Sequence, residues 1–174
     1  MQKGGICVNE KIFEFDNFTV IDKELDFSGS KQQYQIIKRC PCVIIVPEFD
    51  NNFVMINEFR PAIDKMILQF PTGRIEDYES PEEAAKRELK EEAGYEGVKI
   101  KKLGCFYTAA HFCDEKMYVF SIPDMKPTHQ ELTARELIGV ELYKISTFEN
   151  LLSQKLIIDA KSLVAYDMWR RMKG

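Results

Sequence analysis

Three glutamates stand within five positions of the segment RELKEEAG (87–94), and their spacing indicates a metal site. On a helix, like charges three or four residues apart repel by about 0.2–0.5 kcal/mol per pair, and carboxylates near the C-terminal end also oppose the helix dipole. A bound divalent cation would offset both effects, and clustered carboxylate oxygens suit hard ions such as Mg²⁺ or Mn²⁺. We therefore expect Glu88, Glu91 and Glu92 to form one side of a metal site.

The helix that carries these glutamates is predicted over residues 81–93. Ser80 is a favourable N-cap, Pro81 occupies the first helical position, and Glu83 completes an S-x-x-E capping box. Gly94 follows the last turn, where glycine commonly ends a helix. The start and the end of the helix are thus both marked in the sequence.

A helical wheel divides this helix into three sectors. One sector is an apolar stripe that should pack on a sheet, and the opposite sector should meet water. The third holds the three glutamates and Ala84, whose small side chain would leave space beside them. The stripe consists of Ala85, Leu89 and Ala93, and the solvent-facing sector of Glu83, Lys86 and Lys90. A solvated acidic face is the alternative interpretation, but such faces usually mix Lys with Glu at i,i+4.

Much of the remaining chain has the sequence pattern of β-strands, followed by two helices. Residues 6–38 predict short, aromatic-rich strands joined by turns, and 42–49 is a continuous apolar run typical of a buried strand. Further strands are predicted at 53–60, 66–71, 98–109, 115–123 and 136–145, with a polar loop at 124–135. The terminal helices should be capped by Ser146 with Glu149 and by Asp159, the second ending at about Met172. This order predicts an α/β (α+β) fold.

The composition of the 174-residue chain limits the classes of function. A formal net charge of −4 gives no basic surface for a nucleic acid, and an acidic protein that handles a phosphate substrate would use metal cations. There is no apolar run of about 18 residues and no signal-peptide core. The five cysteines include no C-x-x-C pair, so reduced thiols are their simplest interpretation. We therefore expect a cytoplasmic protein that binds neither nucleic acid nor membrane.

The stretch from Gly73 to Tyr95 resembles the Nudix box, G-x5-E-x7-R-E-U-x-E-E-x-G-U, where U is a bulky apolar residue. All seven fixed positions are filled, and the aromatic ring of Tyr95 occupies the last apolar position. At average residue frequencies, chance agreement at one start site is on the order of one in 10⁸. The resemblance implies the Nudix fold, an α/β/α sandwich around a mixed sheet, and metal-dependent hydrolysis of a nucleoside diphosphate linked to another group.

The resemblance also implies roles for the residues of the box. Glu88 and Glu92 are the firmest metal ligands, and Glu91 lies close by as a further ligand or as a base. The backbone at Thr72 adds a carbonyl ligand, and Arg87 orients the glutamates by ion pairing. Gly73 allows a tight turn, and Gly94 ends the helix. Glu79 holds the loop or reaches a metal through water.

Outside the box, most of residues 8–170 resembles the ADP-ribose pyrophosphatase branch of this family. The Phe59-Arg60 pair and the segment HFCDEKMYVF (111–120) match stretches of that branch. The implied substrate-binding residues are Arg60, Gly73, Arg74 and Glu115. A surface arginine and a solvated loop carboxylate are the alternative interpretations of Arg60 and Glu115.

The N-terminal strands fit the same branch, which has an extra sheet that exchanges between protomers. We therefore expect residues 1–38 to form an antiparallel strand subdomain that makes a homodimer. The Nudix hydrolase domain is expected over 39–174.

Two positions depart from the pattern of the branch. This chain has Gln69 where the branch usually has Glu, and Thr72 where the branch usually has Ala. The catalytic base of the branch lies in the loop before the last strand. Here that loop offers Glu131 and Glu136, and Glu131 is the freer to swing toward the metal. His129 in the same loop is expected to be solvated.

The sequence therefore predicts a Mg²⁺-dependent enzyme, with Mn²⁺ as the alternative ion, that cleaves ADP-ribose to AMP and ribose 5-phosphate. Hydrolysis of another nucleotide sugar of the GDP-mannose type, or of a dinucleoside polyphosphate, is the alternative. A non-catalytic nucleotide-binding module fits less well, because every glutamate of the box is present.

Overall fold

The chain divides into two compact units, and the larger one contains the helix with the clustered glutamates. The computed structural model describes residues 5–132 and 138–174. The smaller unit comprises Met1–Pro41 and Phe106–Lys116, and the larger one Cys42–Cys105 and Met117–Gly174. No helix in these described ranges is long and apolar enough to cross a membrane.

The smaller unit is an antiparallel sheet with one further segment attached to it. The sheet has the order β1-β2-β3 and consists of β1 (Ile6–Phe15), β2 (Phe18–Phe27) and β3 (Ser30–Lys38). The segment 106–116 joins β3 because the N–H of Ile37 donates to the carbonyl of Phe112 at 2.7 Å and the N–H of Asp114 donates to that of Ile37 at 3.1 Å. The predicted N-terminal strands are therefore confirmed.

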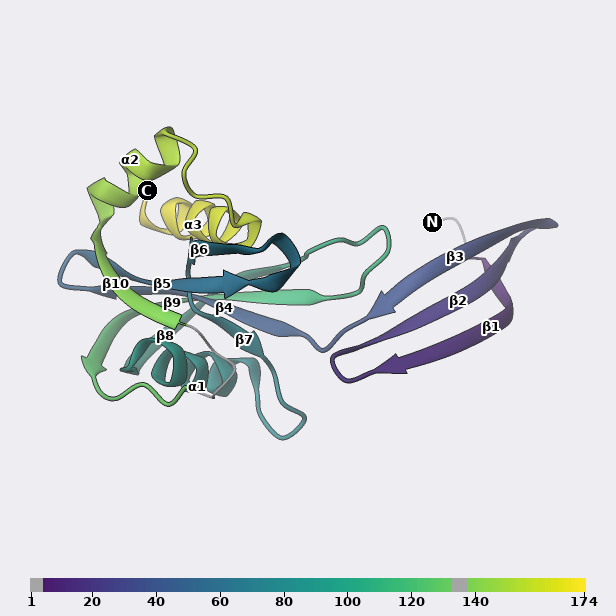
Figure 1. Cartoon of the computed structure of the whole chain (residues 1–174), viewed down its shortest axis with the longest axis horizontal. Helices are drawn as coiled ribbons and strands as arrows, with labels where there is room; N and C mark the ends of the chain where they lie inside the picture. The colour runs from purple at the N-terminus through teal and green to yellow at the C-terminus, as the bar shows by residue number, and fades with distance from the viewer. Residues whose placement is uncertain (1–4, 133–137) are drawn as a thin grey trace. The chain divides into compact units, whose positions relative to one another are not determined.

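The larger unit is built around a mixed sheet with seven strands in the described residues, and its main path is β10-β5-β4-β9-β8 (Figure 1). β4 pairs in parallel with β9, while β5 and β7 pair with β4 in the antiparallel sense and β6 pairs likewise with β5. The strands are β4 (Cys42–Phe49), β5 (Asn52–Arg60), β6 (Lys65–Gln69), β7 (Thr72–Arg74), β8 (Tyr95–Tyr107), β9 (Lys116–Pro127) and β10 (Ile138–Lys144). The helices are α1 (Pro81–Ala93), α2 (Ile145–Ser153) and α3 (Ala160–Lys173), with a 3₁₀ turn at Pro61–Ile63.

The ends of α1 follow the sequence prediction. The hydroxyl of Ser80 accepts from the N–H of Glu83 at 3.3 Å, and the Glu83 carboxylate accepts from the N–H of Ser80 at 2.8 Å. Gly94 has a φ of 71°, a left-handed conformation that glycine adopts at little cost. The predicted capping box and stop signal are confirmed.

One face of the sheet is covered by α1 (Figure 1). The predicted apolar stripe of α1 is buried against β4 and β5 in a cluster whose fully buried members include Val43, Ile45, Val54, Ile56, Ala85 and Leu89. Ala84 is fully buried in the same cluster, so the prediction that it leaves space beside the glutamates is wrong. A helix packed on a sheet buries a stripe at least about 100° wide, which is broader than the three residues first assigned to it.

The other face of the sheet is covered by α2 and α3 (Figure 1). Phe53 of β5 makes an edge-to-face contact with Trp169 of α3, with ring centroids 4.8 Å apart. Asp159 caps α3 as predicted, by accepting from the N–H of Ser162 at 2.9 Å. The Ser162 hydroxyl in turn accepts from the N–H of Phe70 at 2.9 Å. The α3 cap therefore holds the strand that leads into the box, and the predicted α/β/α sandwich is confirmed.

Two predictions at element ends are wrong. β9 continues to Pro127, where a loop was predicted from residue 124, because Met125 is buried against the α1 face of the sheet. α2 begins at Ile145 with Lys144 as its N-cap and without a capping side chain, so Ser146 is not the cap. The backbone passes directly from β10 into α2 and leaves no separate turn for a polar cap.

Candidate active site

Arg87 lies at the centre of the site and joins α1 to the loop before it. Its Nε and Nη2 donate to the two carboxylate oxygens of Glu79 at 3.1 and 2.7 Å. Nη1 donates to Glu88 at 2.8 Å and to Glu91 at 2.9 Å, and Nη2 also donates to the carbonyl oxygen of Arg74 at 2.9 Å. The planar fork of one guanidinium thus fixes three carboxylates and a backbone carbonyl.

The contact between Arg87 and Glu79 favours the charged form of both side chains. The bonds from Arg87 lower the pKa of Glu79, and those to Glu79 and Glu88 raise the pKa of Arg87. One positive charge cannot neutralise three carboxylates, so this end of α1 keeps a negative field. Such a field favours a cation and repels a phosphate.

Glu88 packs directly against the backbone of Gly73. β7 pairs with β4 so that Gly73 is opposite Val43, a residue of the α1 face. A Cβ atom added to Gly73 would lie 1.7 Å from Cδ of Glu88 and 1.9 Å from its Oε1. Glycine is therefore required here by the close approach of the carboxylate. The sequence prediction gave a tight turn as the reason. Gly73 is not among the described glycines with a positive φ, which are Gly29 and Gly94.

Glu92 is the most enclosed carboxylate of the cluster, with 6% of the residue exposed. Its Oε2 accepts a hydrogen bond from the N–H of Thr72 at 2.8 Å. Burial, and secondly the charge of Glu88, raise its pKa well above the ordinary value of 4.5. A buried carboxylate beside a second one is unfavourable in the charged form unless a cation is bound.

The donor set fits a hard divalent ion. Glu88 and Glu92 provide carboxylate oxygens on one side of α1, and Mg²⁺ is commonly bound through one or two carboxylates with waters completing its shell. Glu91 is directed to Arg87 instead. Among the described residues, no three acidic, histidine or cysteine side chains already converge on one point. The pair Glu88 and Glu92 would therefore hold the ion, and the predicted carbonyl from Thr72 remains a prediction.

The segment that follows β9 is attached to the C-terminal end of α1. The side-chain amide of Gln130 donates to the carbonyl of Glu92 at 2.6 Å, and the N–H of Glu131 donates to that of Glu91 at 3.0 Å. The Glu131 carboxylate accepts from Lys90 at 2.6 Å and is more than half exposed. Glu136, the other candidate base, lies outside the described residues. Glu131 is thus held on the outer side of α1 in this structure.

Two of the predicted substrate-binding arginines differ in their surroundings. Arg60, at the end of β5, pairs with Glu58 at 2.9 Å and donates to Gln69 at 3.1 Å, so it is not a plain surface arginine. Arg74 is exposed, and its carbonyl rather than its side chain is the group bound by Arg87. Arg60 lies on the α1 face, where its charge lowers the pKa of Glu92.

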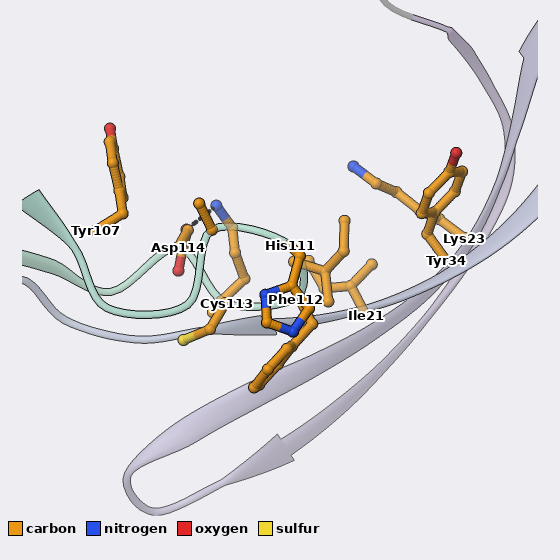
Figure 2. Close-up of a pocket in the computed structure, with 11 residues that line it drawn as sticks. Ile21, Lys23, Tyr34, Tyr107, His111, Phe112, Cys113 and Asp114 are labelled. Carbon is orange, nitrogen blue, oxygen red and sulfur yellow. Dashed lines mark hydrogen bonds and ion pairs between the residues drawn. The ribbon is translucent and has the colours of Figure 1, made fainter. Parts of the chain in front are cut away.

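Glu115 belongs to the smaller unit, and it is not a solvated loop carboxylate. It is 8% exposed and pairs with Arg39 at 2.8 Å. The same unit contains a cavity of about 490 Å³ between its sheet and the segment 107–114 (Figure 2). Figure 2 shows that Lys23 and Tyr34 come from the strands, whereas His111 and Phe112 come from the segment 107–114.

The expected ion pairing of Arg87 with the glutamates is present, but sequence reasoning did not find the partners of Arg60, Glu115 and Glu131. Alternation along β5 places Glu58 and Arg60 on one face, but their contact with Gln69 depends on the β5–β6 register, which the sequence does not reveal. The Arg39 to Glu115 pair and the Lys90 to Glu131 pair likewise join residues far apart in sequence. Of these partners, Gln69 alone had a sequence signal, because it stands where the ADP-ribose pyrophosphatase branch usually has Glu.

Comparison with known proteins finds a family model and several similar proteins. The family model described as NUDIX domain matches residues 38–165. An ADP-ribose pyrophosphatase of Bacillus subtilis is 31% identical over 149 residues, which cover 84% of this chain and 80% of that protein. The ADP compounds hydrolase NudE of Escherichia coli is 28% identical over 178 residues, which cover 100% of this chain and 96% of that protein. A crystal structure of an ADP compounds hydrolase superposes with a TM-score of 0.88 at 25% identity, covering 99% of this chain and 95% of that one.

Replacing Gly73 by alanine should displace the Glu88 carboxylate, because a Cβ cannot fit at 1.7 Å from its Cδ. We expect Gly73→Ala to weaken Mn²⁺ binding by about 10–100-fold, as loss of ligand orientation typically does. Titration followed by electron paramagnetic resonance measures this. Gly139→Ala is the matched control, since nothing lies within 4 Å of a Cβ there. Unchanged affinity in Gly73→Ala would show that Glu88 does not bind the ion.

The raised pKa of Glu92 makes the stability of the metal-free protein depend on pH. From its ordinary value of 4.5 up to the raised value, the folded state retains a proton that the unfolded state has released. The free energy of unfolding therefore falls as pH rises through this range. Glu92→Gln should flatten this slope in urea unfolding at about pH 5 to 8 in the presence of a chelator, whereas Glu96→Gln, at an exposed position, should not. Equal slopes in Glu92→Gln and the wild type would contradict the assignment.

Proposed function

This chain belongs to the NUDIX domain family and is a pyrophosphohydrolase, and from this premise we propose that it hydrolyses ADP-ribose to AMP and ribose 5-phosphate with Mg²⁺. Water adds to one phosphorus of the diphosphate while the bond from that phosphorus to the bridging oxygen breaks. The products are two monophosphates. The observation on which the proposal rests is the pair of carboxylates on α1. Glu88 packs against Gly73 and is bound by Arg87, while Glu92 accepts from the N–H of Thr72.

The substrate class is supported by the relatives. The Bacillus subtilis protein is named for ADP-ribose, and the Escherichia coli protein for ADP compounds. The match to the second covers nearly the whole of both chains, so the similarity includes the N-terminal strands as well as the box. Both names refer to a substrate that contains ADP.

The acidic residues of the site bind and orient the reacting groups through a cation. Members of this family generally use divalent ions, and a bound ion supplies neutralisation of the diphosphate, polarisation of a phosphoryl oxygen and activation of water. Glu88 and Glu92 would hold the ion, with Mn²⁺ as an alternative to Mg²⁺. Arg87 fixes the Glu88 carboxylate so that little reorganisation is needed.

The base that accepts the proton of water comes from a carboxylate near α1. We assign it to Glu131, whose carboxylate must leave Lys90 to reach the site. Glu136 and Glu91 are the alternatives, Glu91 being already held by Arg87. A carboxylate within hydrogen-bond reach of the water would serve as general base.

A homodimer through the smaller unit forms part of the proposal. β1 is an edge strand that exposes several large apolar side chains: Ile6, Val8, Ile12, Phe13 and Phe15. An exposed apolar edge is normally covered by another chain. Sedimentation equilibrium should give about twice the chain mass of 20.3 kDa. A single-chain mass at micromolar concentration would contradict the dimer.

A substrate panel tests the function. Purified protein is incubated with ADP-ribose, GDP-mannose or a diadenosine polyphosphate, with Mg²⁺ or with a chelator, and the products are separated by anion-exchange chromatography. We expect AMP and ribose 5-phosphate from ADP-ribose in the Mg²⁺ sample alone. Glu92→Gln should lower kcat by about 10²–10³-fold, the loss typical of removing one electrostatic contact to a transition state. Intact ADP-ribose beside rapid cleavage of another substrate would refute the assignment.

A further inference from the structure

A closed ring of hydrogen bonds joins three side chains of β5 and β6. Nη1 of Arg60 donates to Oε1 of Glu58 at 2.9 Å, and Nε of Arg60 donates to Oε1 of Gln69 at 3.1 Å. Nε2 of Gln69 closes the ring by donating to Oε2 of Glu58 at 2.7 Å. Gln69 is fully buried, whereas 31% of the Arg60 side chain is exposed. A buried amide therefore links two charged side chains, one of which reaches the surface.

The ring lies on the face of the sheet that α1 covers. Gln69 pairs directly with Ile56 in the β5–β6 ladder, and residues directly opposite in such a ladder point to the same face. Ile56, Glu58 and Arg60 alternate along β5 and therefore share that face. Ile56 packs in the same cluster as Leu89 of α1.

The chain also connects the ring to the buried carboxylate of α1. Gln69 ends β6, and three residues later the N–H of Thr72 donates to Glu92 at 2.8 Å. The segment 69–72, from the end of β6 to the start of β7, thus carries both the amide that holds Arg60 and the donor that holds Glu92. Arg60 and the proposed metal ligands are consequently positioned by one short piece of backbone.

The ring needs an amide at position 69. Arg60 can only donate and an ionised Glu58 can only accept, so the side chain between them must offer one acceptor and one donor. The oxygen of the Gln69 amide must therefore face Arg60, and its nitrogen must face Glu58. A glutamate there would accept from Arg60 but would face Glu58 with a like charge. An apolar residue would leave both charged partners without this contact.

We propose that Gln69 is a positioning residue that holds the Arg60 guanidinium in the orientation needed to bind a phosphate oxygen of the substrate. Two of the three guanidinium nitrogens are engaged inside the ring, and within the described residues Arg60 has no further partner, so Nη2 remains for the ligand. A guanidinium fixed in its plane loses less freedom on binding a phosphate than a mobile one does. The inference rests on the proposed function of the same site.

A polarity swap tests the inference. Gln69→Glu and Glu58→Gln each break the contact between the two side chains, because two acceptors or two donors then face each other. In the double variant Glu58→Gln/Gln69→Glu the amide lies at position 58 and the carboxylate at 69. All three hydrogen bonds can form again at the same net charge: Arg60 still donates to both side chains, and only the bond between positions 58 and 69 reverses its direction.

KM and kcat are measured separately for each variant at saturating Mg²⁺, and the dissociation constant of ADP is measured by calorimetry. Each single variant should raise KM and the ADP dissociation constant by about 10-fold or more, the loss expected for a charge-assisted hydrogen bond. Because Arg60 contributes ground-state binding, kcat should change by less than about 3-fold. The double variant should return KM to within about 3-fold of the wild type.

The outcomes separate the inference from the proposed function. If the wild type prefers another nucleoside diphosphate, the substrate assignment fails, and the same series is run on that substrate. Single variants with wild-type KM, or a folded double variant that does not recover, would overturn the role of Gln69. A purely structural role would lower the melting temperature of the single variants without changing KM. If Gln69→Glu does not fold, Glu58→Gln supplies the comparison, since the Glu58 side chain is 15% exposed whereas Gln69 is fully buried.

Discussion

The geometry of the site depends above all on the Arg87 guanidinium. It binds the loop through both oxygens of Glu79 and the helix through Glu88 and Glu91, so the loop and the helix form one rigid piece. An arginine can make these contacts together because its donors lie in one plane and it stays protonated at any relevant pH. A lysine would offer a single point charge and could not hold the same set of oxygens in place.

This arrangement explains why α1 tolerates three glutamates near its C-terminal end. Arg87 satisfies Glu91 and one oxygen of Glu88, while Glu92 is buried and held by the N–H of Thr72. The helix ends cleanly at Gly94, and its apolar stripe supplies the packing energy. The remaining repulsion is concentrated between Glu88 and Glu92. A bound cation would remove this repulsion, so that the local cost to stability would favour metal binding.

The local elements were largely predictable from the sequence, and the tertiary partners were not. The capping box, the glycine stop and the seven box positions depend on neighbours within a few residues, so spacing alone predicts α1 and its carboxylates. The Gln69 ring depends on which residue of β6 lies opposite Ile56, and a shift by one residue would move Gln69 to the other face. The start of α2 and the length of β9 were mispredicted because packing and strand continuation outweighed local polarity there.

The central claim is that Glu88 and Glu92 hold the divalent ion used for hydrolysis. Anomalous diffraction from crystals grown with Mn²⁺ tests it most directly, because the signal locates the ion independently of activity. The account predicts a peak at coordination distance, about 2–2.5 Å, from carboxylate oxygens of both Glu88 and Glu92. A peak bound elsewhere, or none at Mn²⁺ concentrations that support full activity, would contradict it.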